Sequence, residues 1–128
     1  MNVNNSPTPA RSLLLVDHHY SFVHAVSNVL SGDQRISGLV WAHYGDDAIE
    51  YANKEAPDLV LVDEVLPDGK GIEVGRAIKR VASASRVMLM TVYDAQVYRE
   101  NTWAAGLDGV IDKCKFAEEL AALLDSLP

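Results

Sequence analysis

Residues 59–71 read LVLVDEVLPDGKG, an apolar run that ends on an acid and continues into a segment rich in turn-forming residues. A short apolar run without polar alternation is typical of a strand covered on both faces, as in a parallel sheet. Pro67 and Gly71 follow Asp63 at intervals of four residues, and we expect them to shape the loop by fixing one dihedral angle and relaxing another. Alternatively, Gly71 marks only the entry to the third helix. The stretch therefore predicts a buried strand that presents a carboxylate where the chain leaves the sheet.

Four further apolar runs repeat this pattern along the chain: Leu13–Val16, Leu39–Ala42, Val87–Met90 and Val110–Ile111. Amphipathic segments with helical period lie between and after these runs, and the strongest covers residues 116–127. Five strands that alternate with five helices predict an α/β fold, in which a doubly wound parallel sheet carries helices on both faces and the crossovers are right-handed.

The length of 128 residues fits one domain, and the single cysteine, Cys114, excludes an internal disulfide. A formal net charge of -7 argues against a nucleic-acid-binding surface, because phosphate contacts need clustered Lys and Arg. The apolar runs are far shorter than the roughly 20 residues of a membrane span. We expect a soluble cytoplasmic protein without membrane contact, with residues 1–11 as a flexible leader and residues 12–128 as the domain.

Polar side chains stand at the carboxyl ends of four predicted strands. Asp17 follows the first strand, Asp63 ends the third, Thr91 ends the fourth and Lys113 follows the fifth. Ligands of open α/β sheets bind outside the carboxyl ends of the strands. One such residue alone would be an ordinary cap or surface group, but four on one rim predict a site that combines two carboxylates, a hydroxyl and an ammonium.

These residues and the Asp63, Pro67, Gly71 spacing resemble the receiver domain of two-component response regulators, over about Leu13 to Leu127. The resemblance implies a single-domain, CheY-like (βα)5 fold of the flavodoxin-like class, with strand order 2-1-3-4-5. It also implies that Asp63 accepts a phosphoryl group from a sensor histidine kinase and that the domain then switches conformation. Thr91 and Lys113 would bind that group. We expect a signalling domain and not an enzyme, apart from slow self-dephosphorylation.

The resemblance implies Mg²⁺ as the cofactor, bound by Asp17, Asp63 and the backbone carbonyl of Val65. The family usually carries a second acid after the first strand, and His18 occupies that position here. Neutral imidazole is a poor ligand for Mg²⁺. We therefore expect weakened Mg²⁺ binding, with His18 at most a weak ligand, and we expect Glu64 to point away from the site because side chains alternate along a strand.

Two other positions depart from the family pattern. Val110 stands where many receivers place a Tyr or Phe that swings inward on activation, and a valine cannot make that movement. Cys114 stands where a proline often follows the lysine, so we expect a trans bond between Lys113 and Cys114.

The implied partner is a sensor histidine kinase or a phosphotransfer protein, and homodimers are common in the family. Residues 16–26, VDHHYSFVHAV, are similar to the start of receivers joined to LuxR/NarL-type helix-turn-helix domains. We expect DNA to be bound only through a C-terminal effector domain that is absent from this chain, in a parent protein that regulates transcription.

Two alternative functions remain open. A degenerate receiver could act as a protein-binding module without phosphorylation, which His18 and Val110 would explain. A haloacid-dehalogenase-like phosphatase also uses a strand-end Asp, a Thr and a Lys, but it needs a second acid two residues after the first, where this chain has Val65.

A dedicated histidine metal site is a weaker interpretation of the same stretch. His18 and His19 could form it with His24 or His43, but adjacent residues rarely ligate one ion well and no zinc-like spacing is present. We expect His19 to be the solvent-facing start of the first helix.

Overall fold

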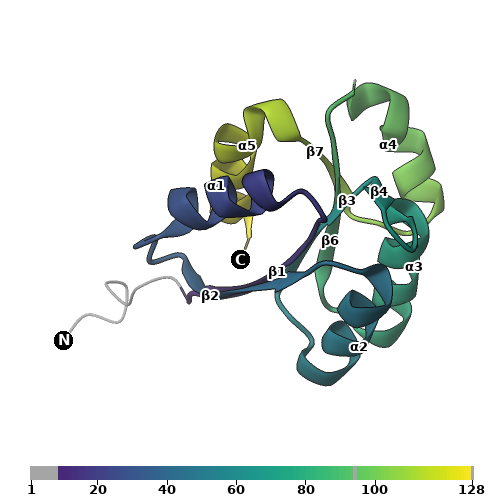
Figure 1. The fold of residues 1–128 in the computed structure, drawn as a ribbon, viewed down its shortest axis with the longest axis horizontal. Coiled ribbons are helices and arrows are strands. Elements are labelled where there is room, and N and C mark those ends of the chain that lie inside the picture. The colour runs from purple at the N-terminus through teal and green to yellow at the C-terminus, as the bar shows by residue number, and fades with distance from the viewer. Residues whose placement is uncertain (1–8, 94, 128) are drawn as a thin grey trace.

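The computed structural model describes residues 9–93 and 95–127; the first eight residues of the predicted leader lie outside them. The main sheet is parallel and contains β1 (Arg11–Val16), β2 (Ile36–Ala42), β3 (Leu59–Asp63), β6 (Arg86–Thr91) and β7 (Gly109–Asp112). Its order is β2-β1-β3-β6-β7 (Figure 1). With these five strands counted along the chain, the order is 2-1-3-4-5, which confirms the prediction.

Helices cover both faces of this sheet (Figure 1). α1 (Tyr20–Leu30) and α5 (Phe116–Ser126) cover one face, and α2 (Gly45–Glu55), α3 (Gly71–Val81) and α4 (Ala95–Ala104) cover the other. The alternation of side chains along β1 divides the core accordingly: Leu13 and Leu15 pack toward α1 and α5, and Leu14 and Val16 pack toward α2 and α3. None of the helices in the described part of the chain is long and apolar enough to cross a membrane.

β3 lies at the centre of the sheet, between β1 and β6. Residues 59–62 of this strand are fully buried, and burial of each such apolar side chain stabilises the fold by about 1.5–3 kcal/mol. The same burial extends to the strand ends, where Asp63 and Asp17 are 4% and 0% exposed. The carboxylates predicted at this edge are therefore withdrawn from solvent.

The loop after β3 contains a small hairpin that the sequence did not predict, formed by β4 (Val65–Leu66) and β5 (Gly69–Lys70). Asp68, in its turn, accepts hydrogen bonds from the backbone N–H groups of Gly45 (2.8 Å) and Asp46 (3.0 Å). These two bonds hold the pKa of the Asp68 carboxyl below its usual range. The loop that follows Asp63 is thus tied to the first turn of α2.

Gly71 begins α3 directly beside the end of β3, and its N–H donates to the carbonyl of Glu64 at 2.9 Å. A Cβ added there would overlap the carbonyl oxygen of Asp63 and lie 2.8 Å from its carbonyl carbon. Gly71 is not among the glycines with a positive φ. The expectation that it relaxes a dihedral angle is therefore wrong, whereas the alternative, that it marks the entry to the third helix, is confirmed. The close backbone approach explains why the residue is a glycine. This contact fixes the distance between the start of α3 and the strand that carries the acid.

We predict that Gly71→Ala lowers the free energy of unfolding by about 3 kcal/mol or more, because the backbone of β3 or α3 must shift. Urea denaturation followed by circular dichroism measures the change. Gly38→Ala is the matched control, since nothing lies within 4 Å of the added Cβ, and it should change stability by less than about 1 kcal/mol. Equal effects of the two substitutions would contradict this role of Gly71.

Candidate functional site

The ammonium of Lys113 joins the two predicted carboxylates. Its Nζ donates to Asp17 Oδ2 at 2.8 Å and to Asp63 Oδ1 at 3.2 Å, and all three side chains are almost entirely buried. The ammonium also lies over the ring of Phe22 of α1, 4.2 Å from the ring centroid. Lys113 opens η2 (Lys113–Lys115), directly after β7. The carboxyl ends of β1, β3 and β7 therefore bring these three groups to one point.

The pKa of the Asp63 carboxyl is set by opposing effects. Burial raises the pKa of its carboxyl, and the neighbouring charge of Asp17 raises it further, while the charge and hydrogen bond of Lys113 lower it. The net result is a raised pKa. Asp63 is thus a poorly solvated carboxylate whose main compensation comes from one ammonium.

Asp17 is held by contacts on three sides. Its Oδ1 accepts from the backbone N–H of His19 at 2.8 Å, while its Oδ2 faces Lys113. Its backbone carbonyl accepts from Nε1 of Trp41, at the end of β2, at 2.7 Å. Sequence reasoning missed this role of Trp41, because a tryptophan within an apolar run gives no sign that its indole N–H has a specific partner.

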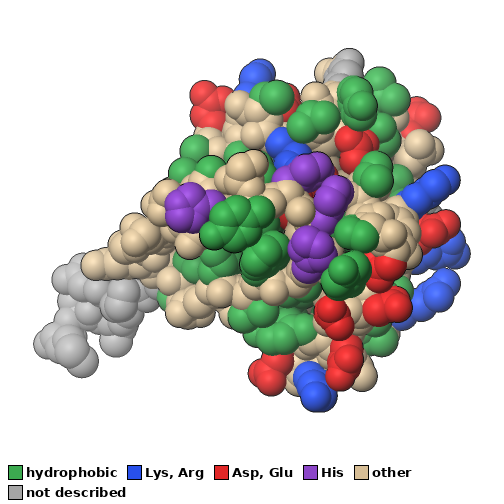
Figure 2. All heavy atoms as spheres, in the orientation of Figure 1, with side chains coloured by type: hydrophobic (Ala, Val, Ile, Leu, Met, Phe, Trp, Pro, Cys, Tyr) green, Lys and Arg blue, Asp and Glu red, His purple; other side chains and the backbone are tan. Residues whose placement is uncertain are grey.

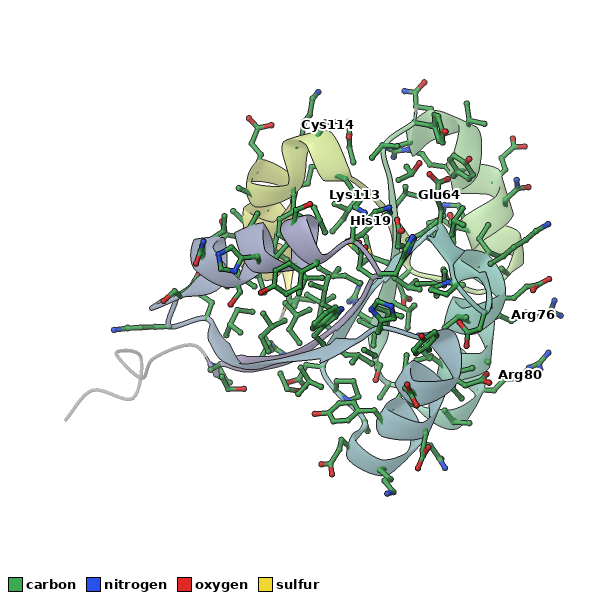
Figure 3. The ribbon with its side chains drawn as sticks, in the orientation of Figure 1. His19, Glu64, Arg76, Arg80, Lys113 and Cys114 are labelled. Carbon is green, nitrogen blue, oxygen red and sulfur yellow. The ribbon has the colours of Figure 1, made fainter. Side chains whose placement is uncertain are left out.

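The imidazole of His19 turns into the site, although its side chain is 53% exposed. Its Nδ1 lies 3.0 Å from Asp17 Oδ1 and 3.5 Å from Asp63 Oδ2. His18 stacks beside it with ring centroids 4.0 Å apart, and His18 Nδ1 lies 3.9 Å from Asp63 Oδ2. Figure 3 shows the His19 and Lys113 side chains close together at this edge of the sheet. The expectation that His19 only starts the helix is therefore incomplete.

Thr91 ends β6, fully buried, next to the strand that carries Asp63. Its Oγ1 accepts a hydrogen bond from the backbone N–H of Tyr93 at 3.0 Å, so the hydroxyl orders the start of the following loop. Glu64 points the other way and hydrogen-bonds Tyr98 of α4, which raises the pKa of the Tyr98 phenol (Figure 3). The expectation that Glu64 does not replace the missing acid is therefore confirmed.

Val65, expected to offer its backbone carbonyl, begins β4 with its side chain 61% exposed. This position offers no general acid of the kind that a haloacid-dehalogenase-like phosphatase would need. Cys114 follows Lys113 with its thiol exposed, and no peptide bond among the described residues is cis. The expected trans bond after Lys113 is thereby confirmed.

Four side chains offer metal donors at this edge: Asp17, His18, His19 and Asp63, with donor atoms that all lie within 4.8 Å of one another. Mg²⁺ favours a shell of oxygen ligands. Half of the donors here are imidazole nitrogens, and Lys113 already engages one oxygen of each carboxylate. The donor set of these residues therefore fits Mg²⁺ poorly.

Comparison with known proteins agrees with this geometry. A family model of the response regulator receiver domain matches residues 13–125. The response regulator protein VraR of Staphylococcus saprophyticus is 32% identical over 111 residues, which cover 85% of this chain and 52% of that protein.

Two solved structures share the fold. A LuxR-family response regulator from Aurantimonas sp. has a TM-score of 0.77 at 21% identity. The match covers 91% of this chain and 86% of the chain of that regulator. The receiver domain of the sensor kinase PA1611 from Pseudomonas aeruginosa, described with magnesium in its active-site cleft, has a TM-score of 0.76 at 22% identity, over 91% and 96% of the two chains. The chain spans about half the length of the curated relatives that it matches.

We predict that Lys113→Met lowers the free energy of unfolding by about 3 kcal/mol at neutral pH, because both buried carboxylates lose their cation. Lys113 lowers the pKa of Asp63, so its removal raises that pKa further above the ordinary value of 3.8. A raised folded-state pKa costs no stability below 3.8, and the cost grows as the pH rises from 3.8 to the folded-state pKa and is constant above it. The difference from wild type should therefore shrink as the pH falls.

Urea titrations across this pH range measure the effect. Lys54→Met is the matched control, because Lys54 is 70% exposed and lies 3.9 Å from an exposed Glu50. It should change stability by less than about 1 kcal/mol at any pH. A Lys113→Met penalty that does not vary with pH would contradict the assigned charge balance.

Proposed function

This chain belongs to the response regulator receiver domain family, and we propose from that premise that Asp63 accepts its phosphoryl group. The domain is the receiver of a two-component response regulator, a signalling domain. The observation that carries the assignment of Asp63 is the bridge from Lys113 Nζ to both buried carboxylates. A cation fixed at this place is what a carboxylate needs to attack an anionic phosphoryl group.

The two carboxylate oxygens of Asp63 have different roles in the proposed transfer. Oδ1 is held by Lys113, while Oδ2 faces the imidazoles and is the oxygen we assign as nucleophile. A bond from this oxygen to phosphorus forms as the phosphorus–nitrogen bond of the donor phosphohistidine breaks, and the electron pair of that bond stays on the donor imidazole. Lys113 then neutralises one oxygen of the transferred group.

The surface beside Lys113 has room for a donor. A depression of about 380 Å³ is lined by His19, Phe22, Lys113 and Cys114, among others. We propose that a sensor histidine kinase or a phosphotransfer protein places its imidazole here. The hydroxyl of Thr91, which accepts from the N–H of Tyr93, would donate its own proton to the phosphoryl group, and its shift toward that group would draw the loop after β6 with it.

Mg²⁺ binding through Asp17, Asp63 and the carbonyl of Val65 remains a prediction, and we expect it to be weak. When bound, the ion would supply positive charge to the phosphoryl oxygens. The matched stretch covers about half of each of these relatives, and we propose a DNA-binding effector domain in the parent protein. A homodimer is also proposed.

The proposal predicts that incubation with acetyl phosphate adds one phosphoryl group to the chain, visible by intact-mass spectrometry and removed by hydroxylamine. Asp63→Asn should abolish the mass gain, and Lys113→Ala should slow it by at least about 100-fold, as loss of one electrostatic donor does in other enzymes. Asp125→Asn is the matched control, because Asp125 is 74% exposed and does not line the depression beside Lys113.

Two results would contradict the proposal. Wild-type protein that gains no mass with any divalent cation present would favour the phosphorylation-independent module. A mass gain that Asp63→Asn retains would place the acceptor elsewhere.

A further inference from the structure

The proposed phosphoryl transfer gives no role to the imidazoles that face Asp63 Oδ2. Histidine side chains gather near the middle of the face shown in Figure 2, and the rings of His18 and His43 lie 6.5 Å apart. His18 and His19 add their nitrogens to Asp17 and Asp63 in the group of four donors. We propose that this group is a site for a late first-row divalent ion, specifically Zn²⁺, and that it prefers Zn²⁺ to Mg²⁺.

Each of the two carboxylates presents one oxygen to Lys113 and the other oxygen to the imidazoles. Asp17 Oδ2 and Asp63 Oδ1 face the Lys113 ammonium, at 2.8 Å and 3.2 Å. Asp17 Oδ1 and Asp63 Oδ2 face the imidazoles. A metal ion on the imidazole side therefore contacts one oxygen of each carboxylate without displacing Lys113.

The Nδ1 atom of His18 is the strongest sign of an incomplete site. It is buried and has no hydrogen-bond partner among the described residues, and its closest carboxylate oxygen, Asp63 Oδ2, is 3.9 Å away. A buried polar atom without a partner costs about 1–3 kcal/mol. A metal ion bound between His18 Nδ1 and Asp63 Oδ2 would satisfy both atoms.

The spacing of the donors suits a tetrahedral ion. Bonds of about 2.0–2.1 Å from zinc to nitrogen or oxygen place neighbouring donors of a tetrahedron about 3.3 Å apart. His19 Nδ1 lies 3.0 Å from Asp17 Oδ1 and 3.5 Å from Asp63 Oδ2, and His18 Nδ1 lies 3.9 Å from Asp63 Oδ2. These three separations differ from that spacing by about 0.6 Å or less, and all four donor atoms lie within 4.8 Å of one another, so side-chain rotations would close the shell around the ion.

The chemistry of the donor atoms also favours zinc and similar ions over Mg²⁺. Imidazole suits Zn²⁺, Cu²⁺ and Ni²⁺, whereas Mg²⁺ favours carboxylate, carbonyl and water. The adjacency of His18 and His19 in the sequence argues against a shared metal site. The structure explains how adjacent residues share one ion: the chain turns into α1 at His19, its N-cap, and the two rings stack with 38° between their planes. The inference deepens the proposed function and rests on it for the role of Asp63, whose Oδ2 would touch the ion.

Isothermal titration of the metal-free chain with Zn²⁺ and with Mg²⁺, in the absence of any phosphodonor, tests the site directly. Wild-type protein should bind Zn²⁺ at least about 100-fold more tightly than Mg²⁺. Titration with Co²⁺ should give the visible absorption of a mixed nitrogen and oxygen shell. His18→Ala should weaken Zn²⁺ binding by about 100-fold or more, because even loss of an outer-shell partner costs 10–100-fold. His18→Asp should improve Mg²⁺ binding and reduce the preference for Zn²⁺.

His24→Ala and Cys114→Ser are the matched controls. His24 is an exposed histidine of α1, and Cys114 is an exposed thiol beside Lys113. Both variants should bind Zn²⁺ as the wild type does. Zn²⁺ binding that survives His18→Ala, or that either control abolishes, would overturn the inference, as would equal affinity for the two ions. If zinc binding fails while Asp63 still gains a phosphoryl group, only this inference falls; if zinc binds and no phosphoryl group is gained, only the proposed function falls.

Discussion

The structure of this site depends on one ammonium placed between two buried carboxylates. Asp17 and Asp63 stand at the ends of adjacent strands, and their charges repel in surroundings that water hardly reaches. Lys113 compensates both, and it is delivered by β7, two strands away from β3. Three other contacts position these groups. Gly71 allows α3 to start close to the end of β3, and Asp68 hydrogen-bonds the first turn of α2. The indole N–H of Trp41 donates to the backbone carbonyl of Asp17. The fold thus concentrates a reactive carboxylate and its counter-charge in one place.

Much of the fold and of the site could be predicted, because the ends of parallel strands obey simple rules. Apolar runs without alternation predicted the five sheet strands, and the parallel arrangement placed their carboxyl ends at one edge. Asp17, Asp63 and Lys113 therefore meet as expected, and Thr91 stands on the neighbouring strand. The side-chain alternation that turns Glu64 away from Asp63 could be predicted for the same reason.

What could not be predicted depends on contacts between segments distant in sequence or on local turns. The β4–β5 hairpin has strands of two residues each, too short to leave a period in the sequence. The reason for Gly71 is an overlap with the carbonyl of Asp63, and spacing alone does not distinguish that from a flexible turn. His19 was assigned to solvent because it begins a helix, yet the turn after Asp17 brings its ring back over the carboxylates. His18 occupies the position of the family's second acid. In the structure, the imidazoles of His18 and His19 lie beside the carboxylates of Asp17 and Asp63.

Asp63 is a buried carboxyl whose pKa is raised by burial and by Asp17 and lowered by Lys113. Carboxyl-carbon NMR of the metal-free chain, followed as a function of pH, measures this balance most directly. We expect the Asp63 carboxyl to titrate above its ordinary value of 3.8, with burial as the main cause and the charge of Asp17 as the second. A midpoint at or below 3.8 would mean that Lys113 outweighs both effects, and it would contradict the poor solvation of Asp63.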